Sequence, residues 1–410
     1  MATIETKAEL EQFLCHNWDT VNRLLDEWQA QVPQPIYSSV DVRESGGKYA
    51  PVDHNLYPAG FNNICQKDLR KASEMFRVAL TRQMPGARRV ALVPESHTKN
   101  KWYLDNVHHL ATTLRDGGFD VDVVSPDPAL FPDGPTLTLE SQSGHGVVLH
   151  QVAVRDGAFQ RVDGPADPFD IVVLNNDQSN PLPVDWRAFR TPVLPSPFAG
   201  WTRRQKNAHF RHYATVADAF CAHFGIRSDL IQARFRGVEG VDFETKEGVE
   251  KLADAVGELL AELPPGSSVF AKASQGTYGM GISVFQSRDE VLAMNRRARN
   301  KMDVGKNNLK FTSVLVQEGV ETVVKVEDAP AEITMYLVDG KGMGGFMRYN
   351  PERGTNANLN SQGMLYRKFC ISDICQDTDT HVKEAAYTVV ARLLVLAASK
   401  EIQEINGENA

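Results

Sequence analysis

Apolar positions near the start of the chain recur at helical spacing. Across residues 10–28 they return every three or four positions, which predicts one amphipathic helix that Pro33 follows and ends. A polar segment at 43–63, rich in Asp, Asn, Gly and Pro, comes next. The apolar positions within 69–80 then predict a second amphipathic helix.

The pattern then changes to short apolar runs that alternate with helical spacing. Runs at 90–93 and 121–124 flank a helical stretch, which predicts a βαβ unit, and further runs at 147–154 and 171–174 extend it. We interpret residues 88–200 as a small open α/β sheet domain. Ligands bind beyond the carboxyl ends of the strands in such sheets. This rule predicts substrate contacts from four polar residues that follow two of the runs, namely Glu95, Ser96, Asn175 and Asn176.

A proline-rich stretch at 191–201 marks the next boundary, and residues 201–410 form the remaining region. This region contains several β-like runs joined by Gly-rich or charged loops. Asp339 and Gly340 separate two of these runs and predict a hairpin turn. A final apolar helix is predicted at about 382–399. The chain as a whole is therefore expected to have an α/β fold.

Composition and charge narrow the range of partners. The 410 residues are 42% hydrophobic and 23% charged, which is ordinary for a globular protein and excludes a wholly disordered chain. The net charge of −8 and the lack of a Lys/Arg run argue against nucleic acid as a partner. No apolar run is long enough to span a bilayer, and the first residues lack the apolar core of a signal peptide, so we expect no membrane partner. The oligomeric state stays open, a homo-oligomer included.

The cysteines suggest a reducing environment. There are five, Cys15, Cys65, Cys221, Cys370 and Cys375, and no two of them form a CxxC pair. An odd, scattered set predicts neither a disulfide framework nor a four-thiolate zinc site. Buried thiols in a cytoplasmic protein are therefore expected.

The most informative motif is a glycine-rich segment at 271–285. It reads as a strand with Lys272 near its end, then Gly276, Gly279 and Gly281, then a second strand. Glycine allows backbone N–H groups to approach phosphate oxygens closely, and a nearby lysine supplies a positive charge for the same anion. The chain has no GxxxxGK[ST] sequence, so a P-loop NTPase is excluded. An ordinary Gly-rich hairpin is the alternative.

Two further segments complete an ordered set of motifs. Residues 314–320 read as a buried strand that ends in Gln-Glu-Gly, and residues 331–341 alternate strictly, with Glu332 on the same face as Thr334 and Tyr336. From about residue 201 to residue 368 this order resembles the ATP-grasp fold, in which ATP lies between two antiparallel sheets. A protein kinase also places a Gly-rich hairpin over ATP, but HRD and DFG motifs are absent here.

The resemblance implies a set of nucleotide contacts. Lys272 corresponds to the phosphate-binding lysine, residues 275–281 to the mobile phosphate lid, and Glu318 with Val320 to the hinge that contacts adenine. Glu332 corresponds to a carboxylate for ribose or metal. Lys206 corresponds to the second nucleotide lysine, and its alternative is a solvated basic helix turn. The implied contacts are Lys206, Lys272, Gln275, Gly276, Gly279, Gly281, Glu318, Val320 and Glu332.

Metal ligands are expected before the α/β domain. Asp53 and Asn55 lie in a Pro-flanked extended segment, where positions i and i+2 project to one side and offer oxygen ligands suited to Mg²⁺. Residues 51–63 resemble the E-x-N segment of circularly permuted, eukaryotic-type glutathione synthetases, with Asp in place of Glu. A plain Asx turn is the alternative. Asn358 is a third candidate ligand.

The segment at 353–369 carries several amides and an arginine. It resembles the substrate-closing segment of the same synthetases, which implies that Arg367 binds a substrate carboxylate. Arg348, on the preceding β-like run, is a second candidate for the transferred phosphate. A solvated loop is the alternative. The pair His209 and His212 could bind zinc in principle, but no further ligands stand nearby, so we interpret it as structural.

Taken together, the motifs resemble those of the bacterial glutamate-cysteine ligases that have an ATP-grasp fold. The resemblance implies that residues 1–87 contribute to the site, that 88–200 form a substrate domain, and that 201–410 bind the nucleotide. It implies ATP and Mg²⁺ as cofactors, and glutamate and cysteine as substrates in the first step of glutathione biosynthesis. Lys272, Arg348 and Arg367 would then be catalytic. Glutathione synthetase, another glutamate-amine ligase of this fold, and a non-catalytic ATP-binding regulatory protein are the alternatives.

Overall fold

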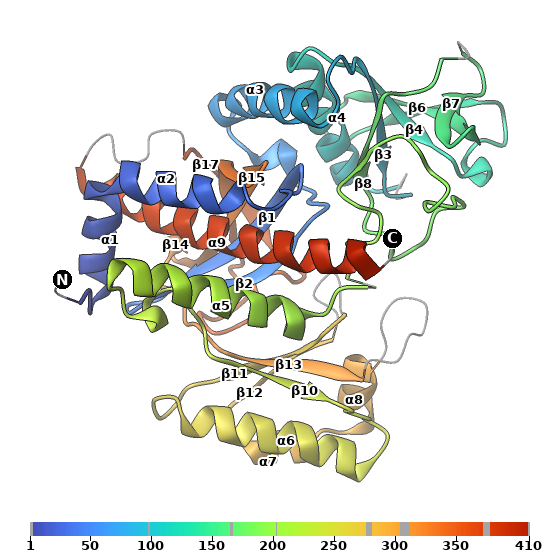
Figure 1. Ribbon diagram of the computed structural model, residues 1–410. Helices are drawn as coiled ribbons and strands as arrows, with labels where there is room; N and C mark the ends of the chain where they lie inside the picture. Colours follow the sequence, from blue (N-terminus) through green and yellow to red (C-terminus); the bar gives the residue numbers. More distant parts are fainter. Residues whose placement is uncertain are drawn as a thin grey trace.

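The computed structural model describes residues 3–96, 99–164, 167–201, 203–275, 281–303, 312–371 and 378–408. Gly276 and Gly279 of the predicted phosphate lid lie outside these ranges. The described residues form two antiparallel sheets and one mixed sheet, with helices packed against them (Figure 1). The α/β class expected from the sequence is confirmed.

An antiparallel sheet occupies the centre of the molecule, with the strand order β17-β16-β15-β1-β2 and with β14 beside β15. Its strands are β1 (Tyr37–Glu44), β2 (Tyr49–Asn55), β14 (Lys325–Val326), β15 (Ala329–Val338), β16 (Lys341–Tyr349) and β17 (Leu365–Phe369). Strands from the two ends of the chain are neighbours in this sheet, because β1 pairs with β15 and places Asp41 opposite Thr334. The hairpin between β15 and β16 turns at Asp339 and Gly340, whose φ angles of 51° and 74° are typical of the predicted two-residue turn.

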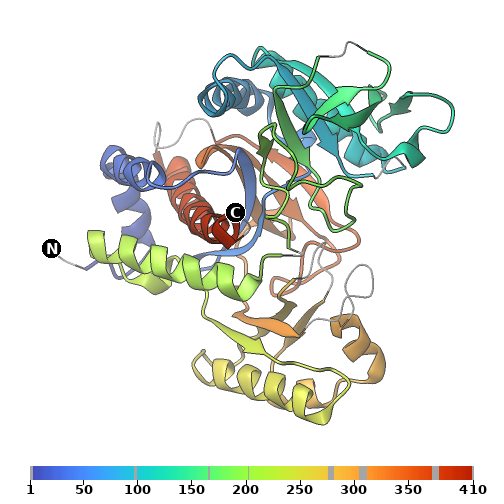
Figure 2. The same ribbon diagram turned by 45° about the vertical axis from the view of Figure 1, so that its right-hand side comes forward.

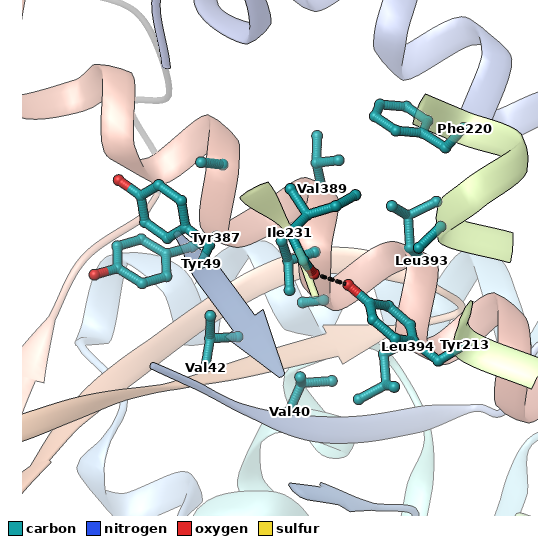
Figure 3. Packing of buried hydrophobic residues seen from close by; sticks show 14 of the residues in the cluster. Val40, Val42, Tyr49, Tyr213, Phe220, Ile231, Tyr387, Val389, Leu393 and Leu394 are labelled. Atoms are coloured by element: carbon teal, nitrogen blue, oxygen red, sulfur yellow. Dashed lines mark hydrogen bonds between the residues drawn. The ribbon is translucent and has the colours of Figure 1, made fainter. Parts of the chain in front are cut away.

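Helices cover one face of the central sheet and form the largest apolar core. These are α1 (Lys7–His16), α2 (Trp18–Gln29), α5 (Lys206–Phe224) and α9 (Thr378–Glu408). Val40 and Val42 of β1 point toward α5 and α9 in this core, where Tyr213 donates a hydrogen bond to the Ile231 carbonyl at 2.6 Å (Figure 3). The helix predicted over residues 10–28 is in fact two helices, because the chain turns at Asn17.

The second sheet is mixed and has the order β5-β6-β4-β3-β8-β9, with β7 beside β6. Its strands are β3 (Arg89–Pro94), β4 (Asp120–Ser125), β5 (Thr136–Glu140), β6 (Gly146–Arg155), β7 (Ala158–Arg161), β8 (Ile171–Asn175) and β9 (Val193–Leu194). Two helices, α3 (Gln66–Gln83) and α4 (Lys101–Asp116), pack with it. Their apolar core also contains Tyr336 and Phe346 of the central sheet, so it joins the two regions.

The third sheet is antiparallel and has the order β10-β13-β11-β12. It contains β10 (Phe235–Glu239), β11 (Val269–Ala273), β12 (Ile282–Phe285) and β13 (Ser313–Glu318), with helices α6 (Lys246–Ala261), α7 (Arg288–Leu292) and α8 (Arg296–Asp303). In both views this sheet and its helices form a separate lobe beside the central sheet (Figure 1, Figure 2). Short 3₁₀ turns lie at Phe61–Asn63, Pro128–Leu130 and Ser228–Leu230.

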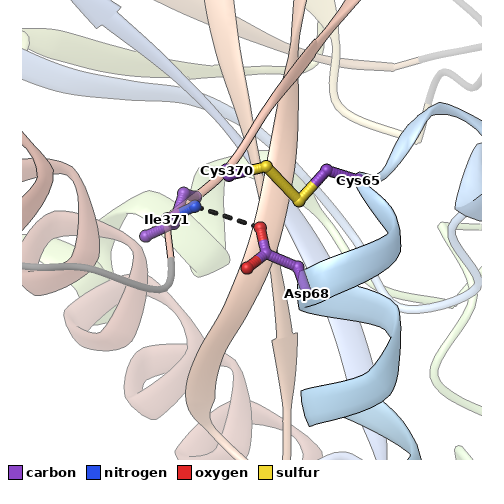
Figure 4. Close-up of a disulfide and its surroundings, with 4 residues drawn as sticks. All are labelled: Cys65, Asp68, Cys370 and Ile371. Atoms are coloured by element: carbon purple, nitrogen blue, oxygen red, sulfur yellow. Dashed lines mark hydrogen bonds between the residues drawn. A yellow bond between two sulfur atoms is a disulfide. The ribbon is translucent and has the colours of Figure 1, made fainter.

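One expectation about the cysteines is wrong. Cys65 and Cys370 form a disulfide, although 305 residues separate them in the sequence (Figure 4). Cys65 precedes the first residue of α3, and Cys370 follows the last residue of β17. Beside them, the Asp68 carboxylate accepts a hydrogen bond of 3.0 Å from the Ile371 backbone N–H. Sequence spacing gave no sign of this pair, because only the tertiary fold brings α3 and the end of β17 together.

The described cysteines outside this bond, Cys15 and Cys221, are free thiols, and Cys375 lies outside the described residues. The sequence predicts no membrane partner, and the helices in the described ranges bear on this prediction. None of those helices has an apolar stretch of the length that a bilayer crossing requires.

Candidate functional site

A cavity of about 650 Å³ lies between the four-stranded sheet and the central sheet. We call it the lysine cavity, after its two lysines. Its lining residues are Asp41, Arg43, Val52, Asp53, Lys206, Phe270, Lys272, Ala273, Ile282, Gln317, Glu318, Val320, Glu332, Asn358 and Asn360. Most of them come from strands of the two antiparallel sheets, so each sheet supplies one wall.

Lys272 reaches this cavity because of the alternation along β11. Val269 and Ala271 belong to the apolar core under α6, so Phe270 and Lys272 point the other way, into the cavity. The Lys272 ammonium donates hydrogen bonds to the Val52 carbonyl at 2.6 Å and to a further acceptor, Gln317 Oε1, at 2.8 Å. Burial lowers the pKa of Lys272 to about 8. Nearby acids oppose this shift in part, and the neighbouring cations add to it.

Lys206 approaches the same space from the first turn of α5. Its ammonium forms an ion pair of 2.7 Å with Asp53 and lies 4.0 Å from the centre of the Trp201 ring. Lys206 is only 4% exposed, so the alternative of a solvated basic turn is wrong. Burial alone would raise the pKa of Asp53, but Lys206 and Lys272 outweigh it and hold that pKa below its usual value.

Two arginines and two acids form a buried network on the central sheet. Glu332 accepts from Arg43 Nε and from Arg348 Nη1, both at 2.9 Å, and Asp41 also accepts from Arg348, at 2.7 Å. Burial would raise the pKa of Glu332, but the two arginines hold it below its usual value. Burial raises the pKa of Asp41, with Arg348 opposing and Glu332 adding. Of the two carboxyl groups, Asp41 is therefore the one that takes up a proton more readily.

A second cavity, of about 640 Å³, adjoins the first and shares Asp41, Asp53 and Asn360 with it. We call it the acidic cavity, because three aspartates line it. Its lining residues are Ser39, Asp41, Asp53, His54, Asn55, Ala59, Asp177, Trp201, Thr334, Tyr336, Arg348 and Asn360. Asp177 reaches it from the loop after β8, so the mixed sheet contributes to its wall.

The structure brings half of the sequence-predicted site residues to these two cavities. Lys206, Lys272, Glu318, Val320, Glu332, Asp53 and Asn358 line the lysine cavity, and Asn55 and Arg348 line the acidic cavity. Gln275 and Gly281 border the undescribed part of the predicted lid. At Gly281 the φ angle is +65°, and a Cβ atom there would lie only 2.7 Å from Ala273 Cβ, so this position requires glycine.

Arg367 does not reach either cavity. It lies opposite Met347 on the neighbouring strand, whereas Arg348 lies opposite Tyr366. Because side chains alternate between the faces of a strand, Arg367 stands on the face away from Arg348. It is also exposed, at the edge of the sheet. The assignment of Arg367 to a substrate carboxylate is not supported by this geometry.

The four contacts predicted from the mixed sheet also stay outside both cavities. They are Glu95, Ser96, Asn175 and Asn176. The Asn175 amide donates to Tyr37 Oη at 3.1 Å and to the Pro58 carbonyl at 2.9 Å, which ties the mixed sheet to the central part. Asn176 Oδ1 accepts from Gln178, at 2.9 Å from both its nitrogens. The strand ends are polar here because they join two parts of the protein.

Several residues that line the cavities are not among those predicted from the sequence, above all Asp41, Arg43 and Asp177. For the first two a signal exists in the sequence. Residues 37–44 alternate, with Val40 and Val42 in the apolar core and Asp41 and Arg43 on the opposite face. Asp177 follows a buried strand, as the rule for ligand sites predicts, but its neighbours Asn175 and Asn176 follow the same strand and are structural.

The histidine pair has the structural role expected for it. His209 is fully buried, and its Nδ1 lies 3.1 Å from a carboxylate oxygen of Glu401. His212 faces Glu404 at 3.3 Å. Burial lowers the pKa of His209 to about 4, with Glu401 opposing this shift. The two histidines therefore contact separate carboxylates and do not converge on one metal ion.

The chain offers a donor set suited to a hard cation where the two cavities meet. Asp41 and Asp53 supply carboxylate oxygens there, and Asn55 and Asn358 supply amide oxygens from opposite sides. Magnesium prefers such oxygen ligands. Asn55 Oδ1 also accepts from the Tyr57 N–H at 2.8 Å, so the Asx turn considered for this segment is present as well.

Comparisons with known proteins agree on one family. The family model GshA, glutamate-cysteine ligase, matches residues 11–402. A crystal structure of a "putative gamma-glutamylcysteine synthetase" from Methylobacillus flagellatus KT is 35% identical to this chain and superposes with a TM-score of 0.88. The match covers 97% of this chain and 96% of that one. A search of curated proteins finds no match. The chain belongs to the GshA glutamate-cysteine ligase family.

Proposed function

We propose that the chain joins L-glutamate to L-cysteine at the expense of ATP, giving γ-glutamylcysteine, ADP and phosphate. One observation carries the proposal. Two buried lysines line one cavity, and this cavity adjoins a second, acidic cavity across Asp41 and Asp53. A triphosphate in the lysine cavity would thus end beside a place where an amino acid can bind. The family of the chain is one of carbon–nitrogen ligases, which form the same type of bond.

In the proposed reaction, a γ-carboxylate oxygen of glutamate attacks the γ-phosphorus of ATP, and the bond to the β-phosphate oxygen breaks. The products of this step are ADP and a γ-glutamyl phosphate. The neutral amine of cysteine then attacks the acyl carbon, phosphate leaves, and the amine loses a proton. A carboxylate must approach a triphosphate for this to happen, so cations have to offset the repulsion between them. We propose Lys206, Lys272 and Arg348, which line the two cavities, as these cations.

We also propose Mg²⁺ as the metal ion. When bound, Mg²⁺ neutralises charge on the phosphate oxygens and orients the transferred group. Asp53, Asn55 and Asn358 would hold it from the protein side, with Asp41 near enough to join them at the shared wall. The ion pair of Asp53 with Lys206 would have to open or be shared when the metal binds.

The arrangement of the sheets also supports a more specific proposal for the nucleotide site. We propose that the two antiparallel sheets around the lysine cavity form an ATP-grasp site, related in layout to that of eukaryotic-type glutathione synthetase. Glu318 and Val320 lie where they could contact adenine, at the end of β13. A cytoplasmic location is proposed with it, because ATP and both amino acids are supplied there. In a reducing cytoplasm, Cys65 and Cys370 would be expected as thiols.

Phosphate release tests the proposal. The purified chain is mixed with ATP and Mg²⁺, and glutamate and cysteine are added separately and together. Release that requires both amino acids, with γ-glutamylcysteine as product, is the expected result. Release only with γ-glutamylcysteine plus glycine would instead identify a glutathione synthetase. Nucleotide binding without release under any of these conditions would favour a regulatory protein and contradict the proposal.

A further inference from the structure

The acidic cavity contains an aspartate whose charge no cation offsets. Asp41 pairs with Arg348 at 2.7 Å and Asp53 pairs with Lys206 at 2.7 Å. Asp177 has no ion pair with any basic side chain in the described ranges, although it lines the same cavity. Its carboxylate is therefore the one charged group of the described cavity wall that is left to meet a positively charged ligand.

The protein holds Asp177 in place on both sides. The Asp177 N–H donates to Glu95 Oε1 at 2.8 Å, and Asp177 Oδ1 accepts from the Ser179 N–H at 2.8 Å. The flanking residues Asn176 and Gln178 are buried and bonded to each other. The predicted substrate residue Glu95 thus acts on the loop that carries Asp177 and does not reach the cavity itself. A carboxylate fixed in this way is suited to bind a ligand without rearranging.

A second observation marks the cavity as a binding site. Arg348 lines it and only 11% of its side chain is exposed, yet its Nε atom has no hydrogen-bond partner among the described residues. Buried polar atoms without partners are uncommon in folded proteins and call for a bound polar group. Arg348 is the only arginine or lysine in the described lining, so the wall offers carboxylates for an ammonium group and a guanidinium for a carboxylate. This combination fits an amino-acid zwitterion.

From this geometry we infer that Asp177 binds the α-ammonium group of the glutamate substrate in the acidic cavity. The inference rests on the proposed function. We choose glutamate over cysteine as the ligand of Asp177 because the amino groups of the two substrates have different roles in the reaction. The amine of cysteine has to be neutral in order to attack, and a carboxylate beside it would stabilise the unreactive ammonium form. The α-amino group of glutamate does not react, so a carboxylate can hold it as a cation throughout the reaction.

The decisive variant is Asp177→Asn. It removes the charge but keeps the Oδ1 atom that accepts from Ser179, so the turn is preserved. The probe is glutarate, which is glutamate without its amino group, used as a competitive inhibitor against glutamate. We expect the KM for glutamate to rise about tenfold or more, since a hydrogen bond to a charged group is lost. The inhibition constant of glutarate and the KM values for ATP and cysteine should stay the same.

Asp185→Asn is a matched control. Asp185 accepts a hydrogen bond from the Arg187 N–H at 3.1 Å in a turn of the same kind, but it is exposed and outside both cavities. This variant should retain the wild-type KM for glutamate. If Asp177→Asn does not fold, as judged by its melting curve, Asp177→Ser is used, because a serine hydroxyl can accept the same turn hydrogen bond.

Each other outcome overturns the inference. An unchanged KM for glutamate would show that Asp177 does not bind it, and a changed KM for cysteine alone would assign the aspartate to the acceptor. An equal weakening of glutamate and glutarate would indicate that Asp177 only shapes the cavity. Wild-type protein that forms no γ-glutamylcysteine would refute the proposed function itself, so the two failures are distinguishable.

Discussion

Two groups of polar side chains among the described residues differ in their partners. At the strand ends of the mixed sheet, the Asn175 amide donates hydrogen bonds to uncharged groups of neighbouring segments. Between the two antiparallel sheets, Lys206, Lys272 and Glu332 carry charges and line open space. A polar residue that follows a strand is therefore weak evidence for a ligand-binding site. Charge placed beside a cavity is stronger evidence.

The largest effect that tests this comparison is expected for Lys272→Ala. If Lys272 contacts the transferred phosphate, its loss should lower turnover about a hundredfold or more, equivalent to roughly 2.7 to 4 kcal/mol of transition-state stabilisation. Steady-state phosphate release measures it. Lys325→Ala is the control, because Lys325 is exposed on β14 and should tolerate the change. Near-normal turnover in a folded Lys272→Ala protein would refute the assignment.

At the strand ends, Asn175→Ala should affect stability instead of chemistry. It takes from the buried Pro58 carbonyl the hydrogen bond that Asn175 donates, and it removes the donor from which Tyr37 Oη accepts, which costs about 1 to 3 kcal/mol. Thermal unfolding should show a lower melting temperature, with the KM values within a few-fold of wild type. Asn180→Ala changes an exposed residue nearby and should leave both the melting temperature and the KM values unchanged. A large rise in a KM with no loss of stability would break the comparison.

The smallest effect concerns pH. With a pKa of about 8, Lys272 is mostly protonated at pH 7 and mostly neutral at pH 9. Nucleotide binding favours the protonated form, so the affinity for Mg-ADP should fall as pH rises, by up to about tenfold over this range. Calorimetric titration measures it. Lys272→Arg stays charged throughout and should show a flat profile; an equally steep profile would assign the titration to another group.

The titration of Lys272 should also change folding stability, but with the opposite dependence on pH. The pKa of Lys272 is lowered in the folded protein, from an ordinary value of 10.5 to about 8. Between these values the unfolded chain binds more protons, so the contribution of Lys272 to the free energy of unfolding rises with pH. Ligand affinity and this contribution to stability therefore move in opposite directions above pH 8.

The parts of the site that could be predicted are those with a local pattern. Lys272 alternates with the core residues Val269 and Ala271. This short segment alone therefore predicts both the strand and a lysine that points away from the core. The two-residue turn at Asp339 and Gly340 is local in the same sense. For these elements, short-range periodicity and turn chemistry decide the structure.

The parts that could not be predicted depend on pairing between distant segments. Asp41 becomes a site residue because β1 pairs with β15 and sets it beside Arg348, which lies far along the chain. The geometry does not support Arg367 as a substrate contact, because the register of β17 against β16 decides which face its side chain takes. No spacing rule within one segment contains this information, since it arises only when the sheet assembles.

The disulfide between Cys65 and Cys370 spans most of the sequence. A protease that cuts the chain once anywhere between these residues would therefore leave two fragments that still migrate together on a denaturing gel. They would separate only after a reductant is added. Limited digestion followed by paired gels would thus show the state of this bond in any preparation of the protein.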